Sequence, residues 1–124
     1  MFEYKARVVR VVDADTLDVI IDLGFNVLTN QRVRMLGINA AEKNTEMGKK
    51  AIDYVRFLLP LGTTVILQSE KDKREKFGRY LARVFFPESK ECLNDVLVTK
   101  GLAVLYDGQS PKELHVPLPT IPEV

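Results

Sequence analysis

The sequence predicts an α+β domain built on a small five-stranded β-barrel. Five segments have the residue pattern of β-strands, and the one long stretch with helical spacing falls between the third and the fourth of them. A shorter helical stretch follows the fifth strand. Three strands, a helix and two more strands is the element order of the OB-fold, an antiparallel barrel. On the pattern alone, an unrelated α+β sandwich stays open as the alternative.

The composition is that of one globular domain. The chain has 124 residues, of which 46% are hydrophobic and 28% charged, so it can bury a sizeable core. A disordered chain would contain fewer hydrophobic residues, and no apolar run is long enough to cross a membrane. The single cysteine excludes an internal disulfide bond and a Cys/His zinc framework. A net charge of +1 argues only against binding nucleic acid by bulk charge.

Three strands are predicted before the first helix, over residues 4–12, 16–23 and 31–38. The second alternates between apolar and polar residues, which is typical of a strand buried on one face. Its apolar face carries Leu17, Val19, Ile21 and Leu23. The segment 24–26 predicts a turn, because Gly and Asn tolerate a positive φ.

The second half of the chain begins with a predicted helix over residues 45–59. Asn44 or Thr45 can cap its start, and Pro60 ends it. The later elements are two strands, 64–68 and 80–86, and a short helix, 93–100. We expect one folded domain over residues 1–108 and an extended proline-rich tail over residues 109–124.

Three short motifs contain residues suited to chemistry on phosphates. Asp13 and Asp15 flank a strand junction, where paired carboxylates suit a hard cation, although Asp is also common in ordinary turns. Arg34 lies near a strand end and Glu42 in the following loop; a guanidinium suits phosphate, and a carboxylate can deprotonate water. Taken separately, each of these segments is better explained as a polar turn or an exposed surface.

The third motif is the segment 76–79, Lys-Phe-Gly-Arg, at the end of a highly charged connection. Its glycine predicts a tight turn that projects Arg79 at a fixed angle. A solvated hairpin loop is the usual fate of such a charge run. The order of all three motifs is more informative than any one of them.

That order resembles the staphylococcal nuclease (thermonuclease) family. The matching patterns are D-x-D-T at 13–16, R-x-x-G-[IV]-[DN]-x-x-E at 34–42, [KR]-[YF]-G-R at 76–79 and G-L-A at 101–103. The resemblance covers roughly residues 4–106. It implies an OB-type barrel and a Ca²⁺-dependent nuclease that cleaves DNA or RNA and leaves 3′-phosphates.

The resemblance also implies a role for individual residues. Asp15 matches the calcium-binding carboxylate, Arg34 and Arg79 match two phosphate-binding arginines, and Glu42 matches the acid that positions or deprotonates the attacking water. Lys76 and Phe77 would contact the substrate. We expect Asp13 to lie close to the metal without binding it.

The sequence departs from the family pattern around the metal. Asn39 stands where many members have a second calcium-binding Asp, so the site loses one negative charge and we expect weaker Ca²⁺ binding. Ala40 can still offer a backbone carbonyl to the cation. Phe77 replaces a Tyr of some members, which removes one phenolic hydrogen bond.

Two other functions remain as alternatives. One is a non-catalytic nucleic-acid-binding module on the same barrel, toward which Asn39 would be a first step. The other is a protein-interaction domain that uses the tail as its ligand. Tyr106 could stack on a base or simply pack in the domain. We expect a monomer without membrane contact. The chain start carries no signal peptide, which predicts a cytoplasmic protein, or an exported one whose leader was removed.

Overall fold

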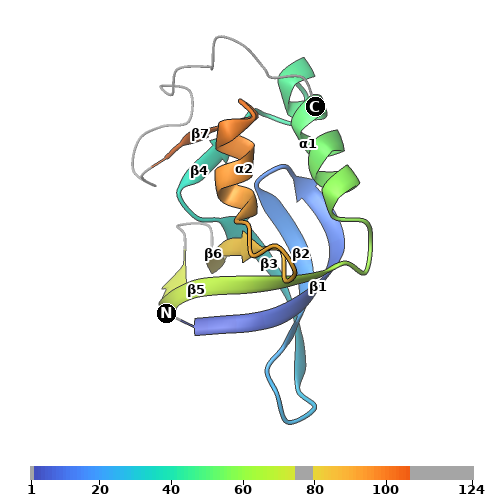
Figure 1. The fold of residues 1–124 in the computed structure, drawn as a ribbon, viewed down its shortest axis with the longest axis vertical. Helices are drawn as coiled ribbons and strands as arrows, with labels where there is room; N and C mark the ends of the chain where they lie inside the picture. The colour runs from blue at the N-terminus through green and yellow to red at the C-terminus, as the bar shows by residue number, and fades with distance from the viewer. Residues whose placement is uncertain (1, 75–79, 107–124) are drawn as a thin grey trace.

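A closed barrel of five strands forms the body of the molecule (Figure 1). The computed structural model describes residues 2–74 and 80–106, without the side chains of 70–74. Around the barrel the strands follow the order β1-β2-β3-β6-β5. Their bounds are Phe2–Asp13 (β1), Thr16–Asp22 (β2), Leu28–Met35 (β3), Thr64–Arg74 (β5) and Tyr80–Phe85 (β6). The predicted barrel is therefore confirmed.

One strand pair of the barrel runs parallel, where the element order predicted an antiparallel barrel throughout. The other four pairs are antiparallel, whereas β3 and β6 are parallel, with Val33 opposite Tyr80. The reason is geometric: strand directions cannot alternate all the way around a ring with an odd number of members. A closed five-stranded barrel must contain at least one parallel pair.

Two helices and a separate pair of short strands lie at one end of the barrel (Figure 1). Their bounds are Glu46–Leu58 (α1), Leu93–Thr99 (α2), Ile38–Ala40 (β4) and Ala103–Leu105 (β7). No helix in residues 2–74 and 80–106 is long and apolar enough to cross a membrane. The predicted tail, 109–124, lies outside the described residues, as does the segment 76–79.

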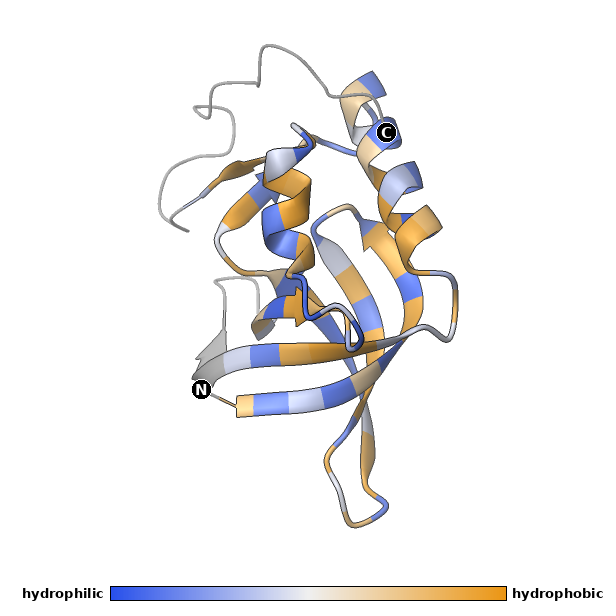
Figure 2. Ribbon diagram, viewed as in Figure 1, coloured by the Kyte–Doolittle hydropathy of each residue, from blue (hydrophilic) through white to orange (hydrophobic). Residues whose placement is uncertain are grey.

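The barrel interior is filled by apolar side chains from every strand. Figure 2 shows hydrophobic and hydrophilic residues alternating along the strands. On β2, Leu17 and Val19 are buried as predicted, whereas Leu23 lies beyond the strand end and is 46% exposed. Thr16, on the predicted polar face, is buried as well, and its hydroxyl group donates a hydrogen bond to Asp15, which offsets the cost of burying it.

Helix α1 begins at a capping threonine. The Oγ1 of Thr45 accepts a hydrogen bond from the backbone N–H of Gly48, at 3.0 Å, which satisfies one of the free donors of the first turn. Of the two candidate caps, the structure selects Thr45. The helix packs against β1 through Ala51, Ile52 and Val55, which are buried.

Helix α2 is tied to the barrel by Asn94, a polar residue that is only 1% exposed. Its side-chain oxygen accepts a hydrogen bond from Val84 N at 3.0 Å, and its Nδ2 donates to Leu36 O at 2.8 Å. Both the oxygen and the nitrogen of this buried amide are thus hydrogen-bonded, and the bonds fix α2 and the chain at Leu36 relative to each other. Leu36 is the residue that follows β3.

The chain turns after Leu36 and forms a strand where the sequence predicted a loop. Gly37 has a φ of +81°, which ends the predicted strand 31–38 early and starts a new direction. The next residues form β4, which pairs with β7 at Ile38↔Leu105 and Ala40↔Ala103. Asn39 is consequently held in a strand rather than in a loop.

Candidate active site

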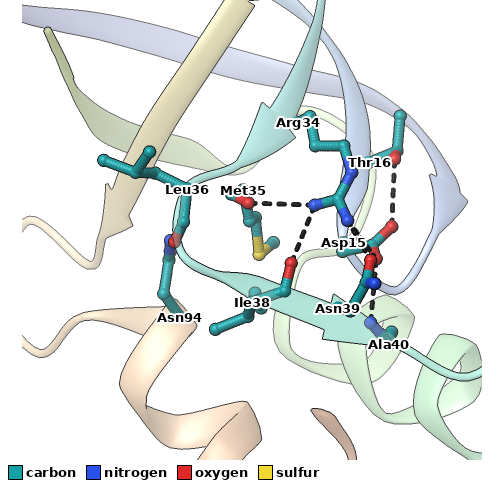
Figure 3. A network of polar contacts seen from close by, with 9 residues as sticks. All are labelled: Asp15, Thr16, Arg34, Met35, Leu36, Ile38, Asn39, Ala40 and Asn94. Atoms are coloured by element: carbon teal, nitrogen blue, oxygen red, sulfur yellow. Dashed lines mark hydrogen bonds and ion pairs between the residues drawn. The ribbon is translucent and has the colours of Figure 1, made fainter. Parts of the chain in front are cut away.

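Three buried polar side chains meet at the end of the barrel that carries β4 (Figure 3). Asp15 comes from the turn between β1 and β2, Arg34 from the end of β3, and Asn39 from β4. Their exposed fractions are 4%, 9% and 4%, respectively. The structure thus brings together three of the residues that the sequence analysis selected.

Backbone pairing places Asp15 beside Arg34 and β4. Thr16 lies opposite Arg34 in the antiparallel β2–β3 pair. The carbonyl of Asp15 accepts a hydrogen bond from Met35 N at 2.8 Å, and its Oδ2 accepts one from Ala40 N at 2.9 Å. The backbone of Asp15 is therefore held by β3, and its carboxylate is oriented by the main chain of β4.

Arg34 is held through both terminal nitrogens. Its Nη1 donates to the carbonyls of Met35 and Ile38, at 3.0 and 2.9 Å. Its Nη2 donates to Oδ1 of Asn39 and lies 3.5 Å from Oδ2 of Asp15. These hydrogen bonds fix the orientation of the guanidinium before any ligand binds. A preorganised phosphate site requires a guanidinium with a fixed orientation.

Tyr106 belongs to the same site, although its sequence position left its role open. Its backbone N–H donates to Gly37 O at 2.8 Å, directly after β7. The centre of its ring lies 5.8 Å from Cζ of Arg34, within range of a cation–π interaction. The pairing of β4 with β7 brings these two residues together although they are far apart in the sequence. The local sequence around Tyr106 therefore does not predict the contact.

Glu42 lies two residues after β4, in the exposed segment before α1. Its backbone is fixed: the carbonyl accepts hydrogen bonds from Thr45 N at 3.0 Å and from Thr45 Oγ1 at 2.6 Å. Gly48 lies against the same carbonyl, where a Cβ would be only 1.8 Å away. The main chain of Glu42 is thus anchored to the first turn of α1. The backbone from which the Glu42 side chain extends is therefore fixed in position.

The other sequence candidates lie around this centre or outside the described residues. Asp13 is half-buried at the end of β1, opposite Thr16. Lys76, Phe77 and Arg79 lie outside the described residues, so the structure does not test them. The described chain resumes at Tyr80, which pairs with Val33, next to Arg34.

The second arginine of β3 is engaged elsewhere. Arg32 lies opposite Asp18 and donates two hydrogen bonds to its carboxylate, at 2.7 and 3.1 Å. These hydrogen bonds hold the pKa of Asp18 below its ordinary value. The pair lies on the exposed face of the sheet, so Arg34 is the arginine of β3 that faces the site.

The oxygen atoms of the site are of the types that hard cations bind, although only one of the residues that carry them has a carboxylate. Asp15 carries a carboxylate, Asn39 an amide oxygen that already accepts a hydrogen bond from Arg34, and Ala40 a main-chain carbonyl; all three residues are buried. Each carboxylate oxygen of Asp15 accepts one hydrogen bond, from Thr16 or from Ala40, which leaves room for a further partner. No group of three or more Asp, Glu, His or Cys residues gathers within the described part of the chain. Carboxylate, amide and carbonyl oxygens are ligand types that calcium takes in proteins. The one carboxylate among these three also lies 3.5 Å from Nη2 of Arg34.

Comparison with known proteins finds matches over most of the chain. A family model described as "Staphylococcal nuclease homologue" matches residues 32–117. An uncharacterized endonuclease of Escherichia coli O157:H7 is 30% identical over 105 residues, which cover 85% of this chain and 63% of the relative. The chain therefore spans less than two thirds of that relative's length.

Two further relatives are longer than this chain. Endonuclease YhcR of Bacillus subtilis is 33% identical over 115 residues, which cover 84% of this chain and 9% of the relative. Protein ParB of Escherichia coli is 30% identical over 111 residues, which cover 84% of this chain and 58% of the relative. Similar domains thus occur within larger proteins.

Proposed function

Because the chain belongs to the staphylococcal nuclease homologue family, we propose that it is an endonuclease that hydrolyses phosphodiester bonds of DNA or RNA. The observation that carries the proposal is the buried Arg34, oriented by two backbone carbonyls and by Asn39. Two relatives of this chain are named endonucleases.

In the proposed reaction, a water oxygen attacks the phosphorus and the bond from phosphorus to the 5′ oxygen breaks. Glu42 orients the water and accepts its proton, and a proton from solvent goes to the departing 5′ oxygen. The products are a 3′-phosphate and a 5′-hydroxyl. Arg34 pairs with the equatorial phosphate oxygens, where negative charge increases during the attack.

We propose calcium as the cofactor, held by Asp15, Asn39 and the carbonyl of Ala40. When bound, the ion supplies positive charge beside the phosphate. Arg79 would contribute a second guanidinium, and Lys76 and Phe77 would contact the neighbouring nucleotide. The parallel pairing of β6 with β3 supports this placement, because the first described residue after Arg79 lies next to the strand of Arg34.

The Glu42→Gln variant tests the proposed activity. We expect cleavage of single-stranded DNA and RNA to require Ca²⁺ and to fall by at least about 100-fold in this variant, because the amide cannot accept the proton. Glu46→Gln is the matched control, since Glu46 is an exposed acid in the first turn of α1. Cleavage that persists in chelator would contradict the calcium requirement, and equal rates in both variants would contradict the role of Glu42. Binding without cleavage at saturating Ca²⁺ would identify a non-catalytic binding module instead.

The Asn39→Asp variant tests the proposed metal site. Restoring a second carboxylate beside Asp15 should tighten Ca²⁺ binding about tenfold, because the number of ligand charges tunes affinity for calcium. The new carboxylate can still accept the hydrogen bond from Arg34. Asn30→Asp, an exposed change on β3, adds the same charge away from the site. Calorimetry should show a change only for Asn39→Asp; equal affinities in the two variants would mean that Asn39 is not a ligand.

A further inference from the structure

A cleft of about 380 Å³ separates the end of β1 from helix α1. Its apolar part is formed by Val11 and Ile52, which are buried. Charged side chains surround this part, from both elements and from the segment between β4 and α1. They are Arg10, Lys43, Lys49, Asp53 and Arg56.

The cleft carries a concentrated positive charge. Four of its charged residues are cations and one is an acid, although the whole chain has a net charge of only +1. Lys43, Lys49 and Arg56 are exposed and form no ion pair with any residue in the described part of the chain. Their charge is therefore available to an anionic ligand.

The spacing of the α1 residues explains why their side chains line one cleft. Lys49, Ile52 and Arg56 are separated by three and four positions, so they share one face of the helix. This face is directed toward β1, because Ile52 packs into the core there. Along this face of α1, Lys49 and Arg56 consequently lie on either side of Ile52, one turn before it and one turn after it.

On both sides of the cleft, the lining residues are close in the sequence to residues of the candidate active site. On one side, Val12 is followed by the turn that carries Asp15. On the other side, Lys43 directly follows Glu42. Along the chain, the cleft residues Val12 and Lys43 thus lie three positions from Asp15 and one position from Glu42.

We propose that this cleft binds the phosphate backbone of the nucleic acid strand on one side of the cleaved bond. The inference rests on the proposed nuclease function and adds a second, sequence-independent binding site for the same substrate. Contacts of lysine and arginine with phosphates position a strand without reading its bases. They also release counterions, so the binding they supply weakens as salt increases.

The double variant Lys49→Ala/Arg56→Ala tests this site, with Arg7→Ala/Lys50→Ala as a matched control. The control also removes one arginine and one lysine; both are exposed, Arg7 on β1 and Lys50 on α1, and neither lines the cleft. Binding of a labelled oligothymidylate of about 12 nucleotides is measured by fluorescence anisotropy in the Glu42→Gln background, where we expect cleavage to be at least about 100-fold slower. A dinucleotide, which is too short to reach the cleft, serves as the second ligand.

We expect the cleft variant to bind the long strand about tenfold more weakly and the dinucleotide as well as the parent does. The slope of log affinity against log salt should fall by about 1.4, because two fewer counterions are released from a single strand. The control should behave like the parent. Equal weakening in both double variants, unchanged affinity in the cleft variant, or a parent that does not bind the long strand would each overturn the proposal.

Cleavage by the unmodified chain, and the KM of the cleft variant with Glu42 intact, separate the two proposals. If the unmodified chain fails to cleave but the cleft variant selectively loses affinity for the long strand, the nuclease function fails and the cleft site stands. If the unmodified chain cleaves and the cleft variant has an unchanged KM on long DNA, the cleft proposal alone fails.

Discussion

Replacing Arg34 with alanine is expected to reduce the free energy of unfolding by about 3 to 5 kcal/mol, the cost of breaking a buried ion pair from one side. The change leaves the carboxylate of Asp15 at 4% exposure without its cation. It also removes the donor to the carbonyls of Met35 and Ile38. Loss of the guanidinium that we propose to bind phosphate should abolish cleavage as well.

Urea denaturation provides the measurement for this prediction, and the chain offers a matched control. Arg32→Ala removes an arginine from the same strand, where the side chain is exposed and its partner is the surface carboxylate of Asp18. We expect this control to change stability little, because exposed ion pairs contribute little. Equal losses for the two arginines would show that the burial of Arg34 has no energetic consequence.

The double variant Arg34→Ala/Asp15→Asn identifies the cause of the loss. If an unpaired buried charge is responsible, neutralising Asp15 should recover part of the stability that Arg34→Ala removes. A loss that is simply additive would assign the effect to the carbonyls of Met35 and Ile38. Cleavage should remain absent in the double variant in either case.

The contrast between Arg32 and Arg34 also shows how far the sequence could predict this site. Arg32 and Arg34 are two positions apart in the predicted strand 31–38, so alternation puts them on the same face, and only the family resemblance singled out Arg34. Their different burial depends on the partner across the β2–β3 pair, a surface acid for one and the turn with Asp15 for the other. Alternation within one strand carries no information about that partner.

Elements with strong local patterns were predicted in their right places, although β5 continues to Arg74 where the sequence predicted its end at residue 68. Elements formed by distant pairing were not predicted. Helix α1 and its Thr45 cap follow from spacing and capping chemistry. Strand β4 has three residues, too few for any periodicity, and it exists because β7 pairs with it. The positions of Asn39 and of Tyr106 both depend on that pairing, so local sequence could suggest neither.

Gly48→Ala is expected to lower the free energy of unfolding by about 2 kcal/mol, within the usual cost of overpacking. A new Cβ would lie 1.8 Å from the carbonyl oxygen of Glu42 and 2.5 Å from its carbonyl carbon. Both atoms belong to the main chain, and that carbonyl is held by two hydrogen bonds from Thr45. The clash can be relieved only by moving Glu42 or the first turn of α1.

The sign of this effect distinguishes close packing from helix propensity. In an open helical position, alanine is more favourable than glycine by roughly 1 kcal/mol, so propensity alone predicts a more stable protein. Because the methyl group here meets fixed backbone, the structure predicts the opposite result. Lys50→Ala, an exposed change in the same helix, should leave both stability and cleavage close to those of the parent.

The activity of Gly48→Ala gives a second, independent measure of how Glu42 is positioned. If the displaced backbone moves the carboxylate, kcat should fall by at least about tenfold while KM changes little, since Arg34 and its partners remain in place. A variant that is as stable and as active as Lys50→Ala would mean that the segment before α1 adjusts without cost. Gly48 would then have no part in holding the residue proposed to activate water.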